Sequence, residues 1–115
     1  MLTTELMDKL LLFRKERDWE QFHSPKNLSA SICIEAAELL EHFQWAKDSD
    51  LTKIVSQDHE EIEHEIADIA ILLAYLCHDL NVSLNDAIDK KLAINRAKYP
   101  VEKARGVATK YDRLK

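Results

Sequence analysis

Two short acidic motifs contain the residues of this chain that could do chemistry. Glu35-Ala36-Ala37-Glu38 and Glu65-Ile66-Ala67-Asp68 each place two carboxylates three residues apart. On a helix, residues i and i+3 lie about 60° apart around the axis, so each pair would project from one side of its helix. Four carboxylates gathered in this way repel one another unless cations lie among them. The pattern therefore leaves two alternatives, a divalent metal site or two solvated helix faces.

One acidic pair alone is a weak signal, because charged side chains usually lie in solvent. Two pairs favour the metal site more strongly, since each borders an apolar helical segment. The stretch between them is also long enough to let two helices lie adjacent and antiparallel. Ligands that offer only oxygen favour a hard ion such as Mg²⁺ or Mn²⁺ over zinc.

A competing metal site is suggested by Glu20-x-x-His23 and Glu61-x-x-His64, which match the Glu-x-x-His motif of di-iron carboxylate bundles. This alternative is disfavoured, because Glu20 and His23 fall in a connector beside Pro25 and the chain is short for that architecture. We assign the other histidines to polar helix faces rather than to ligation: His42, His59, His64 and His78.

The elements that must position these residues are helices. One glycine and two prolines leave few breaks in 115 residues, which predicts an all-α fold. Ser24 before Pro25 and Ser83 before Asp86 are typical helix starts. Four helices of this length predict a four-helix-bundle-type fold, with sites built from facing side chains. The predicted helices cover residues of about 3–16, 25–45, 58–80 and 84–98, with a short helix or loop at 49–56 and a weakly structured tail from about 100.

Composition predicts one domain over residues 1–115, since 46% apolar side chains suffice for a sizeable core. A net charge of −5 argues against a nucleic-acid polymer as partner but leaves single nucleotides open, because a metal can mediate the contact.

Cys33 and Cys77 fall in apolar helical segments, as expected of buried thiols in a reducing compartment. Residues 1–12 do not resemble a signal peptide, and the longest uncharged run, 69–77, is too short for a membrane span. We expect a cytoplasmic protein without membrane contact.

Aromatic side chains lie on both sides of the first acidic motif. Trp19, Phe22 and Trp45 could simply pack in a core or a subunit interface. The two tryptophans could also offer faces on which a nucleobase stacks, with His23 and Asn27 supplying hydrogen bonds. The sequence leaves both interpretations open.

The end of the predicted fourth helix carries polar and basic side chains. Asn95, Arg96 and Lys98 could meet phosphates, although cations in a last helical turn are also expected from the helix dipole.

Five motifs in a fixed order carry a family resemblance over about residues 13–111. They are Arg17-Asp18-Trp19-Glu20-Gln21-Phe22-His23-Ser24-Pro25-Lys26-Asn27, Glu35-x-x-Glu38, Phe43-Gln44-Trp45, Glu65-x-x-Asp68 and Asn95-Arg96-x-Lys98-Tyr99-Pro100. This combination resembles the MazG-like all-α nucleoside triphosphate pyrophosphohydrolases, and most of all their dCTP pyrophosphatase branch.

The resemblance implies an enzyme that converts a nucleoside triphosphate to the monophosphate and pyrophosphate, by attack of water at the α-phosphorus. It implies Mg²⁺, with Mn²⁺ as a substitute, and a homodimer or homotetramer whose interface completes the site. Glu38 is the candidate base for water, and Glu35 is the second catalytic carboxylate. The implied metal ligands are Glu35, Glu38, Glu65 and Asp68. The implied base pocket contains Trp19, His23 and Trp45, the substrate-side candidates are Asn95, Lys98 and Tyr99, and the candidates for supporting the ligands are Glu41 and Glu61.

Two positions depart from the dCTP branch, where a histidine and a tyrosine help to line the base pocket. Leu10 and Leu72 stand there in this chain, and Tyr75 lies one turn beyond the second of them. The resemblance therefore leaves the base open among dCTP, a methylated or noncanonical relative, and dATP. The alternative from another functional class is a non-catalytic helical protein that binds a partner through its aromatic surface.

Overall fold

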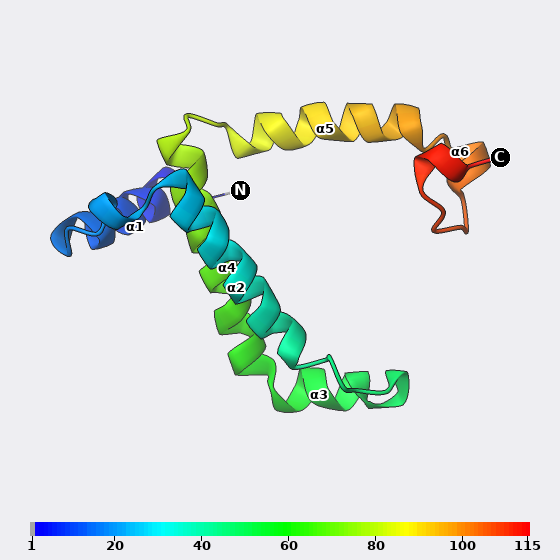
Figure 1. Cartoon of the computed structure of the whole chain (residues 1–115), viewed down its shortest axis with the longest axis horizontal. Coiled ribbons are helices and arrows are strands. Elements are labelled where there is room, and N and C mark those ends of the chain that lie inside the picture. Colours follow the sequence, from blue (N-terminus) through cyan, green and yellow to red (C-terminus); the bar gives the residue numbers. More distant parts are fainter. Residues whose placement is uncertain (1) are drawn as a thin grey trace. The chain divides into compact units, whose positions relative to one another are not determined.

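In the computed structural model, which describes residues 2–115, the chain is entirely helical, so the all-α prediction is confirmed (Figure 1). Residues 2–81 and 82–115 form two compact units, which are described separately below. The α-helices are α1 (Thr4–Glu16), α2 (Pro25–Glu41), α3 (Leu51–Gln57), α4 (His59–Asp79), α5 (Leu84–Lys98) and α6 (Val101–Ala104), and the 3₁₀ turns are η1 (Glu20–Phe22), η2 (Asp48–Asp50) and η3 (Tyr111–Arg113).

Side-chain caps explain where several helices begin. The Ser24 hydroxyl accepts the Asn27 backbone N–H at 3.1 Å, and Pro25 follows as the first helical residue, as predicted. Thr3 caps α1 in the same way. Ser83 accepts the Asp86 N–H at 3.5 Å, which is a long contact. After α4, Asn81 adopts a left-handed backbone (φ 55°), which ends that helix as expected.

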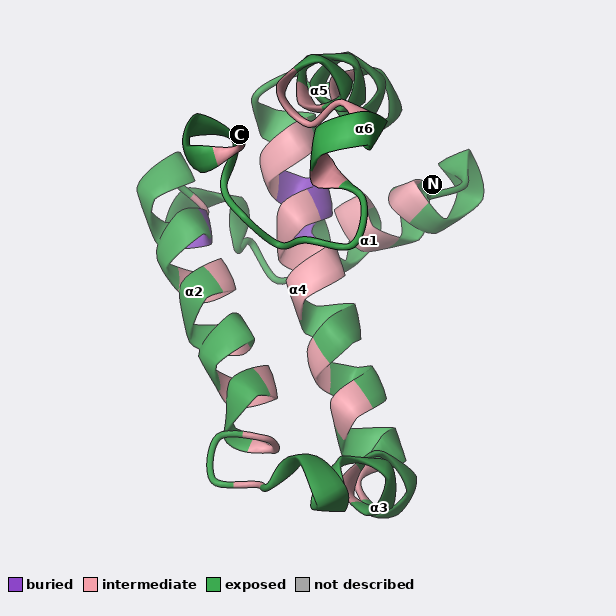
Figure 2. Cartoon of the chain, turned by 90° about the vertical axis from the view of Figure 1, so that its right-hand side faces the viewer, coloured by how far each residue is buried: buried purple, intermediate pink, exposed green. Residues whose placement is uncertain are grey.

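The first unit is built on α2 and α4, which lie side by side (Figures 1 and 2). They run antiparallel, because the turn after α2, η2 and α3 return the chain to the start of α4. The prediction that the second helix continues to Trp45 is wrong, since α2 ends at Glu41 and residues 42–45 form turns. The helix α1 also contacts α4. This arrangement brings both acidic motifs onto neighbouring helices.

The core is smaller than the composition predicted. Among the described residues only Leu28, Ala74 and Tyr75 are buried apolar side chains (Figure 2). On α4 the buried side is the one that carries Tyr75, which is 3% exposed. Ile66, one of the apolar residues that recur at helical spacing along α4, is 53% exposed. The expectation of a sizeable core within one chain is therefore wrong for residues 2–115, because much of the apolar stripe faces outward.

Two further sequence-based expectations concern cysteines and membranes. Cys33 is exposed and Cys77 is half-buried, so the prediction of two buried thiols is wrong for Cys33. Within residues 2–115 no single helix is long and apolar enough to cross a membrane, although α4 and α5 taken together across the break between them would be.

The second unit consists of α5 followed by α6 and η3. Its last residues fold back onto the end of α5, where the rings of Tyr99 and Tyr111 meet edge to face with centroids 6.1 Å apart. The Lys98 ammonium lies 4.4 Å from the centroid of the Tyr111 ring, and the Tyr111 N–H donates to the Tyr99 hydroxyl. Aromatic and cation–π contacts thus organise a segment that lacks an apolar periodicity.

In the first unit, Arg14 attaches α1 to the end of α4. Its guanidinium is buried and donates two hydrogen bonds of 2.8 Å to the Asp79 carboxylate, and it lies 4.6 Å from the centroid of the Tyr75 ring.

We expect Asp79→Ala to lower the free energy of unfolding by about 3 kcal/mol, because a buried cation would lose its partner. The value lies at the low end of the usual range, since Asp79 is partly exposed. Urea unfolding at one protein concentration measures it. Asp8→Ala, on the exposed side of α1, is the control and should change the value by less than about 0.5 kcal/mol.

The same pair predicts a dependence of stability on pH. The hydrogen bonds from Arg14 hold the pKa of Asp79 below its usual value. A lowered carboxyl pKa stabilises the fold above the unfolded-state pKa of about 3.9, and this contribution is lost as the pH falls through the folded-state pKa. The difference in unfolding free energy between wild type and Asp79→Ala should therefore shrink in acid. A difference that stays constant from pH 7 to pH 3 would contradict this account.

Candidate active site

The four predicted metal-binding carboxylates converge between α2 and α4. Glu35 and Glu38 lie one turn apart on α2, and Glu65 and Asp68 lie one turn apart on α4. Burial raises the pKa of Glu35, and a hydrogen bond with Glu38 together with the charges of Glu38, Asp68 and Glu65 raises it further. The charges of Glu38, Asp68 and Glu65 thus all act on Glu35.

The donor set fits a divalent cation. Oε2 of Glu35 is buried and has no hydrogen-bond partner among the described residues. A carboxylate oxygen in that position is costly without a proton or a cation beside it. Within residues 2–115 no group of three or more His, Cys, Asp or Glu side chains has a geometry that could hold a metal ion. The fit to a cation therefore rests on the chemistry of the donors, since carboxylate oxygens suit a hard ion such as Mg²⁺.

A histidine joins this cluster. The His42 ring, at the end of α2, has its Nε2 2.6 Å from Oε2 of Glu65 and its Nδ1 3.1 Å from Oδ2 of Asp58. The first contact is an ion pair by distance and lacks the geometry of a linear hydrogen bond. The hydrogen bond with Asp58 is the main cause that raises the pKa of His42, and Glu65 acts in the same direction. The assignment of His42 to a solvated polar face is therefore wrong.

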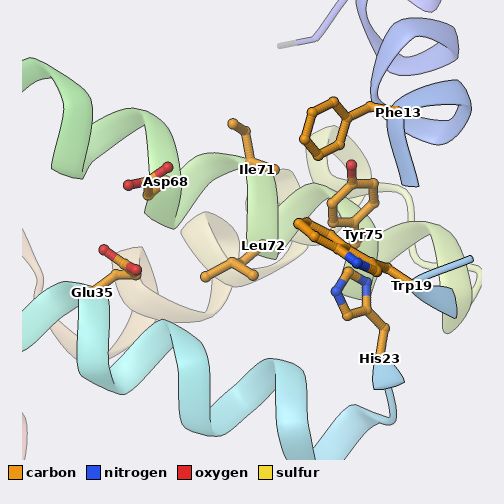
Figure 3. A pocket seen from close by; sticks show the side chains of 8 residues that line it. All are labelled: Phe13, Trp19, His23, Glu35, Asp68, Ile71, Leu72 and Tyr75. Atoms are coloured by element: carbon orange, nitrogen blue, oxygen red, sulfur yellow. The ribbon is translucent and has the colours of Figure 1, made fainter. Parts of the chain in front are cut away.

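A cavity of about 290 Å³ opens beside the carboxylates (Figure 3). Carboxylates from both helices lie at one end of it and aromatic rings at the other. Its volume is near the lower limit for small-molecule sites. The lining residues are Phe13, Trp19, His23, Glu35, Asp68, Ile71, Leu72 and Tyr75.

Ring contacts hold the aromatic end together. Trp19 and Phe13 meet edge to face at 5.7 Å, and the His23 ring lies 5.3 Å from that of Tyr75. The Tyr75 hydroxyl donates to the Leu10 carbonyl at 2.6 Å, so it is already engaged. Nδ1 of His23 is buried and has no hydrogen-bond partner among the described residues, and burial together with Arg14 lowers the pKa of His23. A neutral imidazole therefore supplies the polar atoms at this end of the cavity.

The structure brings four of the predicted site residues to one cavity and leaves four others of the first unit outside its lining, namely Glu38, Glu65, Asn27 and Trp45. Trp19, His23, Glu35 and Asp68 line the cavity. Asn27 does not, and its side-chain amide instead donates to the Phe22 carbonyl and holds the connector in place. Trp45 is 88% exposed in the turns after α2. The substrate-binding roles of Asn27 and Trp45 remain predictions.

The predicted phosphate-side residues belong to the second unit. Asn95 and Lys98 lie in the last turn of α5, and the Asn95 carbonyl accepts the Tyr99 N–H at 2.8 Å. Within its own unit Lys98 lies against Tyr111, as described above. Their contact with substrate likewise remains a prediction.

Sequence reasoning missed several lining residues. Ile71 and Tyr75 follow Asp68 by three and seven residues, so helical spacing places all three on one face of α4 and could have identified them. His42 follows Glu35 and Glu38 by seven and four residues, which is the same signal on α2. Phe13 lies on α1, and no local pattern distinguishes it from the other apolar residues of that helix.

Fold and site together define an all-helical protein with a carboxylate cluster on two antiparallel helices and an aromatic cavity beside it. The sequence model of the MazG-like family matches residues 30–114, and the chain belongs to that family. The resemblance stated from the motifs is thereby confirmed.

The names of similar proteins agree with membership of the MazG-like family. The chain is 40% identical over 104 residues to dCTP pyrophosphatase 1 of Rattus norvegicus and 38% identical to that of Homo sapiens, covering 89% of this chain and 61% of each relative. It thus spans about three fifths of the length of these proteins. A pyrophosphatase of known crystal structure from Archaeoglobus fulgidus is 42% identical in sequence to this chain. The two structures superpose with a TM-score of 0.81, covering 84% of this chain and 90% of that one.

The position of Glu35 among other carboxylates predicts that it lowers the free energy of unfolding of the metal-free chain. We expect Glu35→Gln to raise the free energy of unfolding of the metal-free chain at pH 7 by about 1 kcal/mol, because a buried carboxylate among like charges becomes neutral. The gain should disappear in acid, where the raised pKa of Glu35 leaves the wild-type group protonated. Urea unfolding in EDTA measures both effects. Glu63→Gln, on the exposed side of α4, is the control, and a destabilised Glu35→Gln variant would contradict the electrostatic argument.

Proposed function

We propose that this chain is a Mg²⁺-dependent nucleoside triphosphate pyrophosphohydrolase that releases the monophosphate and pyrophosphate. The observation that carries the proposal is the single cavity with Glu35 and Asp68 at one end and Trp19 and His23 at the other. A nucleotide likewise has a charged end and a flat end. Its anionic triphosphate needs a cation, and its base needs a flat apolar surface. The names of the relatives, pyrophosphatases that include two that act on dCTP, support the same reaction.

At the acidic end, the carboxylates of α2 and α4 would hold the cation. Glu35, Glu38, Glu65 and Asp68 are the proposed ligands, and their oxygens would accept Mn²⁺ as well as Mg²⁺. When bound, the cation supplies positive charge for the triphosphate oxygens. Without it, the acidic end would repel the substrate.

Glu38 is the proposed base for the attacking water. It lies one turn from Glu35, whose pKa is raised by burial and by Glu38, Asp68 and Glu65. Glu38 would accept a proton from water as the oxygen attacks the α-phosphorus, and the bond from that phosphorus to the bridging oxygen would break with pyrophosphate as leaving group. Positioning by the rigid helix pair would supply much of the rate enhancement.

At the aromatic end, Trp19 would stack on the base and neutral His23 would make a hydrogen bond to it. The Trp19 ring is 44% exposed, which leaves part of it free for stacking. Because the Tyr75 hydroxyl is engaged by Leu10, Tyr75 offers its ring rather than its oxygen. We propose dCTP or a modified or noncanonical deoxynucleoside triphosphate as substrate. Asn27, Trp45, Asn95, Lys98 and Tyr99 are the remaining proposed substrate contacts.

We further propose a homodimer or homotetramer. Ile66 on α4, Leu80 directly after α4 and Trp45 beyond α2 are large apolar side chains that a single chain leaves exposed. Covering them with a second copy would supply the core that the single chain lacks, and would extend the predicted bundle. The same exposed surface favours the second candidate function, a non-catalytic helical protein that binds a partner.

Hydrolysis of a panel of nucleoside triphosphates distinguishes the two functions. With Mg²⁺ the chain should convert at least one deoxynucleoside triphosphate to monophosphate and pyrophosphate, as measured by anion-exchange chromatography, and EDTA should stop the reaction. No turnover of any triphosphate would rule out the enzyme and leave the binding protein.

A substitution then tests the assignment of the base. Glu38→Gln should lower kcat by about 10²–10⁴-fold, the usual contribution of a general base, while the circular dichroism spectrum stays unchanged. Glu63→Gln is the control, because Glu63 lies exposed on α4 and should leave kcat as in wild type. A fully active Glu38→Gln enzyme would refute the assigned role.

A further inference from the structure

We propose that His42 is a positioning residue that holds Glu65 in place for cation binding. The inference rests on the proposed function, because it concerns one of the four proposed ligands. It adds a residue that the acidic motifs do not contain.

The imidazole of His42 spans two carboxylates from another helix. Its Nε2 lies 2.6 Å from Glu65 and its Nδ1 lies 3.1 Å from Asp58, and the side chain is only 15% exposed. Both carboxylates belong to the start of α4, whereas His42 ends α2. Nδ1 is therefore hydrogen-bonded to Asp58, while Nε2 lies within ion-pair distance of Glu65.

Asp58 gives independent support. It is the N-cap residue of α4, a position where aspartate normally accepts backbone N–H groups of its own helix. Here the Asp58 side chain makes no capping hydrogen bond, and its carboxylate oxygen meets Nδ1 of His42 instead. A carboxylate that orients a histidine, which in turn meets a ligand, is the arrangement that usually supports metal ligands.

The chemical consequence concerns the conformation of Glu65. A free glutamate side chain loses about 1.5–2 kcal/mol of rotamer entropy when it is fixed. His42 fixes Oε2 of Glu65 while the protein folds, so less of this cost arises when the cation binds. The other oxygen, Oε1, remains to ligate. His42 thus does not ligate the cation itself, and it acts through Glu65.

Two amide substitutions separate this role from a merely structural link between α2 and α4. The side-chain nitrogen of glutamine can take the place of Nε2 and still donate to Glu65. The shorter asparagine can take the place of Nδ1 and still meet Asp58. Positioning of Glu65 requires the first contact, whereas a link between the helix ends can be kept through the second.

Mg²⁺ titration calorimetry of the full chain without nucleotide measures the effect. We expect His42→Asn to weaken Mg²⁺ binding about 10–100-fold, the usual cost of losing a group that supports a ligand, and His42→Gln to stay within about threefold of wild type. His59→Asn is the matched control, because His59 is exposed and only approaches Glu63 at 3.8 Å. Equal loss in both His42 variants, or loss in neither, would overturn the inference.

A second measurement needs no variant and therefore does not depend on folding of His42→Asn. Addition of Mg²⁺ to the wild-type chain should shift the imidazole ¹⁵N resonances of His42 and leave those of His59 in place. Mg²⁺ binding without a shift at His42 would contradict positioning through Glu65. Absence of Mg²⁺ binding to wild type would overturn the proposed metal site together with this inference, whereas binding that survives His42→Asn overturns the inference alone.

Discussion

Repulsion between like charges is the physical constraint on which the first unit depends. Two antiparallel helices hold Glu35, Glu38, Glu65 and Asp68 within reach of one another, although each would be more stable alone in water. In the metal-free chain, burial and the neighbouring carboxylates raise the pKa of Glu35, and His42 lies against Glu65. The same repulsion would favour a cation beside the carboxylates, as the proposed function requires.

The two ends of the cavity solve opposite electrostatic problems. At the acidic end, Glu35 keeps an oxygen without a hydrogen-bond partner in the part of the chain that the structure describes. At the aromatic end, Arg14 is paired with Asp79 and its field helps to lower the pKa of His23. Arg14 also lies against Tyr75, whose hydroxyl is bound to α1, so one buried cation fixes both the helix contact and the pocket wall. The cavity therefore joins a carboxylate end to an aromatic end.

Local sequence signals predicted most of the helices. The features that they did not predict depend on contacts between helices. Caps at Thr3 and Ser24 and the scarcity of glycine and proline determine where the helices start, and these features are visible in the sequence. The acidic motifs predicted the carboxylate cluster, because i, i+3 spacing fixes the direction of side chains on each helix. The roles of His42 and Tyr75 depend on which faces of α2, α4 and α1 meet. With so much apolar surface left uncovered, periodicity alone could not distinguish the buried face from the exposed one.

The contact between His42 and Asp58 also affects how this fold can vary. The two residues are 16 positions apart, yet they hold the end of α2 against the start of α4. The turn, η2 and α3 between them form a loop whose ends are fixed independently of its length, and loop closure depends only weakly on length. Insertions or deletions in this loop should therefore leave the carboxylate cluster undisturbed. It is the part of the first unit that is free to diverge in sequence while the chemistry stays the same.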